Sequence, residues 1–201
     1  MEPRENVRNL ILLGSWNSLL FNPKWLNNNI FDGKLPEKVN TEVLIHGNSV
    51  LHRVFDLPHF KLEVSEERLC FLLKKYQDNY YQELIDAANN ILTKLQHTPM
   101  KSLGINIVFT EKTKVPFEKA QNFYDFDNLS QANENLIISE TDHRIRIAIN
   151  RNSNLTEFDF NYSYNVESTA KVKEILISGM FNEKYDKSLD YSNNLMEKYD
   201  V

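Results

Sequence analysis

Glycine is scarce in this chain, with five residues among 201. Loops that cradle phosphate groups depend on glycine, because the backbone N–H groups have to approach the phosphate closely, and neither GxGxxG nor GxxxxGK occurs. Ser15 also lacks the surrounding glycines that expose a nucleophile on a sharp turn. We therefore do not expect nucleotide binding by a standard phosphate loop, or serine catalysis of this type.

Cysteine is almost absent, and no long apolar run occurs. The single Cys70 cannot form an internal disulfide, which agrees with a reducing compartment. No apolar run approaches the roughly 20 residues of a membrane-spanning helix, and the first residues lack the apolar core of a secretory signal. These features predict a cytoplasmic protein, and the frequent asparagine favours a bacterial source with an AT-rich genome.

An excess of basic charge is missing as well. The net charge is −5 and the sequence pI is about 5.6, so no global positive field attracts the chain to phosphate backbones or acidic membranes. The basic residues are scattered along the chain. We expect neither a nucleic acid nor a membrane as the partner.

Recognisable metal and catalytic motifs are also lacking. The five histidines do not form the tight pairs typical of zinc sites, so we expect no metal and no cofactor. A metal-dependent phosphodiester hydrolase would use carboxylates such as Glu157 and Asp159 together with His143. No Glu-x-Lys triplet follows an acid-bearing strand at a suitable distance, so this activity is the weakest alternative, and we do not expect an enzyme.

What the chain does contain is a strict alternation in "EFDFNYSYNVES", residues 157–168. Large apolar side chains occupy every second position, which is typical of an antiparallel strand with one buried and one solvated face. They are Phe158, Phe160, Tyr162, Tyr164 and Val166. Acidic and amide residues separate the rings, so the basic groove of a base-stacking surface is missing. The hydroxyl groups of both tyrosines need partners inside a core, or else they line a pocket.

Two helices are predicted by apolar residues at steps of three and four. One runs from about Asp78 to Gln96, and the other begins at Ser168, a fitting N-cap, and continues to Phe181. Strand patterns dominate the remainder, and a hairpin is expected around Thr141 and Asp142. The fold class expected is α+β: an antiparallel sheet covered on one face by the two main helices, in the order strand, helix, four strands, helix, with an N-terminal strand and short-helix extension.

We expect the 201 residues to form a single domain. Within it, residues 1–8 are predicted to be a flexible N-terminus and residues 9–60 the strand and loop extension. Residues 61–181 are predicted to form the α+β core, and residues 182–201 a polar helical tail.

Two groups of apolar residues suggest how such a protein acts. Trp16, Phe21 and Trp25 form a large apolar load that either plugs one end of the core or serves as an exposed interface anchor. The tail keeps Tyr185, Leu189, Leu195 and Met196 in helical register, and we expect Tyr185, Leu189 and Met196 to contact a partner. The resulting hypothesis is a non-catalytic cytosolic interaction module that acts through a protein partner or as a homo-oligomer. The alternative is a small-molecule sensor with a pocket between sheet and helices lined by Tyr162 and Tyr164.

Overall fold

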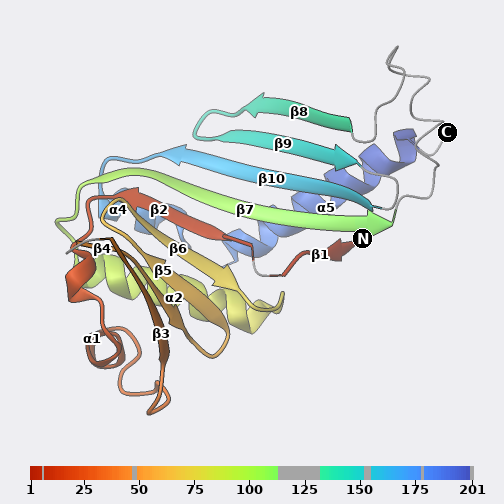
Figure 1. The fold of residues 1–201 in the computed structure, drawn as a ribbon. Helices are drawn as coiled ribbons and strands as arrows, with labels where there is room; N and C mark the ends of the chain where they lie inside the picture. The colour runs from red at the N-terminus through yellow and green to blue at the C-terminus, as the bar shows by residue number, and fades with distance from the viewer. Residues whose placement is uncertain (6, 47–48, 113–131, 152–154, 178, 200–201) are drawn as a thin grey trace.

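The protein is described by a computed structural model that covers residues 1–5, 7–46, 49–112, 132–151, 155–177 and 179–199. The described chain is a mixed α+β structure in which a ten-stranded sheet packs with four α-helices (Figure 1). Every recorded strand pair is antiparallel. The predictions of an α+β class and of an antiparallel sheet are therefore confirmed.

The ten strands are β1 (Glu2–Pro3), β2 (Leu10–Gly14), β3 (Asn40–His46), β4 (Ser49–Asp56), β5 (Phe60–Val64), β6 (Arg68–Leu73), β7 (Met100–Lys112), β8 (Ala132–Ser139), β9 (Arg144–Arg151) and β10 (Leu155–Asn165). Their order across the sheet is β3-β4-β5-β6-β2-β7-β10-β9-β8, and β1 pairs with the far end of β7. The strand β2 was expected in an N-terminal extension, and the structure places it between β6 and β7, in the middle of the sheet.

The helices are α1 (Pro23–Asn29), α2 (Asp78–Lys94), α4 (Thr169–Ile175) and α5 (Met180–Tyr199), with a short 3-10 helix, η1 (Ser18–Leu20), before α1. Side-chain capping residues mark the start of two of these helices. The Asn22 side chain accepts a hydrogen bond from the Trp25 N–H at 2.9 Å, and Pro23 occupies the first turn of α1. The Ser168 hydroxyl accepts one from the Lys171 N–H at 3.2 Å at the start of α4.

The prediction of two main helices is not confirmed. The segment expected to be one helix from Ser168 to Phe181 is divided, because α4 ends at Ile175 and α5 begins at Met180. Gly179 lies between them with a φ of +82°, a left-handed conformation that glycine adopts at little cost and that interrupts a right-handed helix. The predicted polar tail becomes the larger part of the 20-residue α5.

Alternation along β10 and the apolar stripe of α2 supply much of the core. Phe158, Phe160 and Tyr162 are completely buried, while the residues between them are partly exposed. The stripe of α2 belongs to the same apolar cluster. In Figure 1, α5 runs behind β7 and β10, and its Tyr185 packs against Phe109 of β7 at 5.1 Å between ring centroids.

Asn9, directly before β2, is a completely buried polar residue at the centre of the sheet. Its side-chain oxygen accepts a hydrogen bond from the Leu73 N–H at 2.9 Å, and its amide donates to the Tyr76 hydroxyl at 2.8 Å. A buried amide is tolerated when its groups are bonded in this way. Its amide also donates to the Asn106 carbonyl of β7 at 3.3 Å. Asn9 therefore joins β6 to β7 directly before the start of β2.

None of the helices in the described ranges combines the length and the apolar character that crossing a membrane requires.

Candidate functional site

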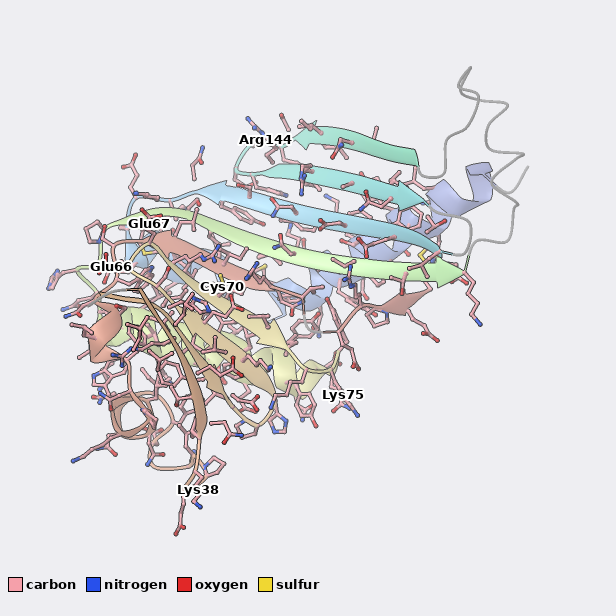
Figure 2. All side chains as sticks on the ribbon, viewed as in Figure 1. Lys38, Glu66, Glu67, Cys70, Lys75 and Arg144 are labelled. Atoms are coloured by element: carbon pink, nitrogen blue, oxygen red, sulfur yellow. The ribbon has the colours of Figure 1, made fainter. Side chains whose placement is uncertain are left out.

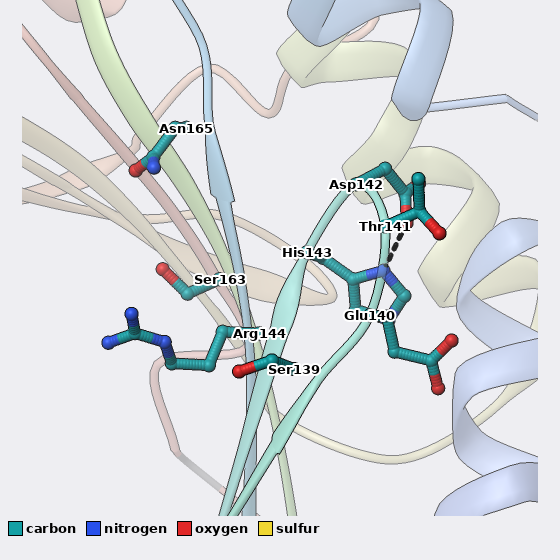
Figure 3. Close-up of a pocket in the computed structure, with 8 residues that line it drawn as sticks. All are labelled: Ser139, Glu140, Thr141, Asp142, His143, Arg144, Ser163 and Asn165. Carbon is teal, nitrogen blue, oxygen red and sulfur yellow. Dashed lines mark hydrogen bonds and ion pairs between the residues drawn. The ribbon is translucent and has the colours of Figure 1, made fainter.

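A polar cavity of about 300 Å³ surrounds the turn between β8 and β9 (Figure 3). The turn itself is closed by the Glu140 N–H, which donates to the His143 carbonyl at 2.9 Å. Six residues of the turn and its flanks line the cavity together with two residues of β10: Ser139, Glu140, Thr141, Asp142, His143, Arg144, Ser163 and Asn165. The antiparallel register explains this gathering, since Arg144 lies opposite Ser139 on one side and Ser163 on the other.

The side chain of His143, one of the lining residues, is largely enclosed, with 6% of it exposed. Its Nδ1 lies 2.6 Å from Asp142 Oδ1, and this hydrogen bond holds the pKa of Asp142 below its usual range. The imidazole stacks on the Tyr164 ring, with centroids 4.8 Å apart and an angle of 20° between the planes. Its Nε2 has no hydrogen-bond partner among the described residues, so no hydroxyl or thiol nucleophile completes a triad there.

Ionic contacts connect the turn to α5. The Lys187 ammonium group donates to Glu140 Oε1 at 3.1 Å, and this bond lowers the pKa of Glu140. Lys184 lies over the Tyr162 ring at 5.4 Å from its centroid, within cation–π distance. The described residues contain no group of three or more histidine, cysteine or acidic side chains that could hold a metal ion. The Lys187–Glu140 ion pair therefore attaches the turn to α5.

Tyr162 and Tyr164, the predicted ligand-binding residues, are 0% and 3% exposed. The Tyr162 hydroxyl lies 2.8 Å from the Ser188 hydroxyl and donates to the Lys184 carbonyl at 3.3 Å, so α5 supplies its partners. Burial raises the pKa of both phenols. Neither tyrosine lines the cavity at the β8–β9 turn, and their role in ligand binding stays a prediction.

The described side chains of the six predicted interaction residues differ in burial. Trp16 and Phe21 are buried in the core, where neither presents its ring to a partner. Trp25 is partly buried against Phe21, with ring centroids 5.2 Å apart. Tyr185 and Leu189 of α5 are partly buried and pack against the core. The side chain of Met196 lies outside the described residues.

The residues considered for a metal-dependent hydrolase lie on opposite faces of the sheet. Alternation along β10 places Glu157 and Asp159 on the face opposite Tyr164, on which His143 stacks. Glu157 forms an ion pair with Arg4, and Asp159 lies 3.7 Å from Arg146. The structure therefore does not bring His143 together with these two carboxylates.

Among the described strands, β3 and β8 lie at the two ends of the sheet order, and both carry exposed apolar side chains. On β3, Val43, Leu44 and Ile45 are 45%, 58% and 59% exposed; we call these three residues the β3 edge patch. On β8, the exposed apolar residues are Leu136 and Ile137. Outer strands carry unpaired backbone donors and acceptors that can pair with another strand. Sequence patterns identified both segments as strands, but alternation does not distinguish an outer strand from an inner one.

No protein-family model matches the chain, and searches of curated proteins and of solved structures find no significant match. A fold supports many functions, so function has to be inferred here from the surfaces and cavities themselves.

Proposed function

We propose that the protein is a non-catalytic cytosolic interaction module that self-associates by pairing of its β3 strands. The observation that carries this proposal is the β3 edge patch, three consecutive apolar residues on a strand for which β4 is the only described partner. Proteins usually protect such edges, because an exposed apolar edge strand is a template for pairing with another chain.

Exposure on both faces of β3 supports this role. In a strand packed on a core, successive side chains alternate between buried and exposed, yet residues 41–45 are all exposed. Figure 2 labels Lys38, two residues before the start of β3, at the lower tip of the molecule. The sequence of β3, NTEVLIH, contains neither lysine nor proline, and Glu42 is its single acidic residue. Residues 41–45 of β3 are therefore accessible to a partner on both faces of the strand.

The arrangement of the patch favours a second copy as that partner. If two β3 strands pair antiparallel with Leu44 on the two-fold axis, Val43 of each copy lies opposite Ile45 of the other. The patch is thus complementary to itself, as a two-fold symmetric interface requires. Directly opposed side chains contribute about 0.2–1 kcal/mol each, in addition to the backbone hydrogen bonds. The register shift between Leu44 and Ile45 arises in the pairing with β4 and leaves β3 itself continuous.

A non-catalytic role is supported by the surroundings of His143. Its Nδ1 is bonded to Asp142, and its Nε2 has no partner among the described residues that could act as a nucleophile. The carboxylates Glu157 and Asp159 are held by arginines on the other face of β10.

The test measures molar mass by size-exclusion chromatography with light scattering over a range of concentrations. We expect the wild type to approach twice the chain mass as concentration rises, and Leu44→Lys to weaken the dimer by about tenfold or more, because the new charge lies on the two-fold axis. Leu19→Lys is the matched control, since Leu19 is 65% exposed and lies in η1, outside the sheet. It should leave the mass profile unchanged.

Ile137→Lys serves as a second control on the opposite edge of the sheet. If this variant loses the dimer while Leu44→Lys keeps it, β8 is the interface and the assignment to β3 is wrong. A wild type that stays monomeric at every concentration would contradict self-association altogether. Hydrogen exchange supplies an independent readout, because amides of β3 that pair between copies become protected as the dimer forms.

A further inference from the structure

We infer that a cavity between the start of α2 and the first turns of α5 is a binding site for a small organic cation that carries an ammonium group. The cavity has a volume of about 230 Å³, below the usual range of drug-sized pockets and suited to a small ligand. Three tyrosines and two aspartates are among its lining residues: Tyr76, Tyr81, Tyr185, Asp78 and Asp186. This site does not depend on self-association through β3.

The aromatic rings form a corner of the kind that surrounds ammonium groups. The Tyr76 and Tyr81 rings are nearly perpendicular, at 82°, with centroids 5.5 Å apart. The Tyr185 ring of α5 lies 5.6 Å from Tyr76 at an angle of 43° and adds a third wall. Ring faces carry the negative part of the aromatic quadrupole, so a cation placed among them is attracted, and quaternary ammonium ligands are bound in this way.

The charged residues around the cavity are acidic, so their negative charge attracts a cation. Asp78 and Asp186 both line it, and neither takes part in an ion pair with another described residue. Their proximity is evident from Tyr185, whose pKa is raised by burial and further by these two carboxylates. No lysine or arginine belongs to the lining among the described residues. Asp78 also lies in the first turn of α2, where it offsets the positive end of the helix dipole.

Neutral polar groups complete the lining of the cavity. The side-chain amides of Gln77 and Asn182 belong to it together with the rings and carboxylates. An amide can donate a hydrogen bond to a hydroxyl group or accept one from it. A cation that also carries a hydroxyl group, such as choline, therefore suits the lining better than a purely apolar cation.

Isothermal titration of the 201-residue chain tests the site. The probes are choline, tetramethylammonium and 3,3-dimethyl-1-butanol, a neutral molecule with the shape of choline. We expect both cations to bind, choline more tightly, and the neutral analogue to bind at least about tenfold more weakly, because it lacks the cation–π and carboxylate attraction. A peptide with trimethyllysine, titrated in parallel, distinguishes a free cation from a methylated side chain as the natural source.

Variants then connect binding to the cavity. Asp186→Asn keeps the shape and removes one charge, and we expect choline binding to weaken by about tenfold. Asp190→Asn is the matched control on α5, an exposed aspartate outside the cavity lining, and should bind choline as the wild type does. The inference is overturned if the neutral analogue binds as tightly as choline, if neither cation produces heat, or if both variants lose binding equally. Circular dichroism of each variant establishes that the fold is retained.

Discussion

At the scale of single residues, Asp159 shows how burial changes an acid on the polar face of β10. Its side chain is 30% exposed, and this burial raises the pKa of the carboxyl group above its usual value. Arg146 lowers that pKa in part, at a distance of 3.7 Å between the charged atoms. Because the raised pKa means that the folded state favours the protonated form, ionisation of Asp159 costs stability as pH rises through this pKa.

We predict that Asp159→Asn raises the free energy of unfolding at neutral pH, because the amide avoids the cost of a partly buried charge. The gain should shrink as pH falls toward the ordinary aspartate value of about 3.9, where the wild-type carboxyl becomes protonated. Urea denaturation at neutral and at acidic pH measures both quantities, and the exposed Asp190→Asn serves as the reference. A variant less stable than wild type at neutral pH would mean that the attraction to Arg146 exceeds the cost of burial.

At the scale of elements, the docking of α5 on β10 depends on a buried pair of hydroxyl groups. Tyr162 and Ser188 lie 2.8 Å apart, and both residues are completely buried. One residue earlier in the helix, Lys187 forms an ion pair with Glu140 of the β8–β9 turn. The two contacts together attach α5 to β10 and to this turn.

Removing either hydroxyl leaves the other without this partner. We predict that Tyr162→Phe and Ser188→Ala each lower the free energy of unfolding by about 1–2 kcal/mol, with the double variant costing less than the sum. Chemical denaturation of the four proteins in this cycle gives the coupling energy. Strictly additive losses would show that the 2.8 Å contact contributes nothing specific to the docking of α5.

At the scale of the whole molecule, the position of β2 makes the N-terminal third part of the sheet. Leu10 and Leu12 are completely buried, and β2 pairs with β6 on one side and β7 on the other. Without β2, the strands β3–β6 would be separated from β7–β10. The two halves depend on one another through a strand that begins at residue 10.

We predict that a chain beginning at residue 61 does not fold cooperatively, because the inner edges of β6 and β7 would lose their shared partner. A chain beginning at residue 9 is the control, since it keeps β2 and lacks only residues 1–8, which include β1. Thermal unfolding followed by circular dichroism should be cooperative for the control and absent or broad for the shorter chain. A cooperative transition in the shorter chain would mean that residues 61–201 are an independent core.

Sequence patterns predicted the secondary structure correctly where neighbouring residues determine it. The helix expected over 78–96 is α2, Asp78–Lys94, because its apolar stripe has the helical period. The hairpin expected around Thr141 is the β8–β9 turn, and the alternating row became β10 with its rings buried. In the predicted helix from Ser168 to Phe181, the apolar residues kept helical spacing on both sides of Gly179, so periodicity alone did not reveal the break.

The sequence by itself determined segments such as α2 and β10 and which side of each is apolar, since these follow from a period of 3.6 or two residues. Only the tertiary structure decided which strand lies at an edge, where β2 inserts, and that Tyr76 and Tyr185 meet although they are far apart in the chain. These relations depend on which elements pair although they are far apart in the sequence. The pattern of residues within one segment does not specify its partner. Both proposed sites, the β3 edge patch and the tyrosine-lined cavity, arise at this level.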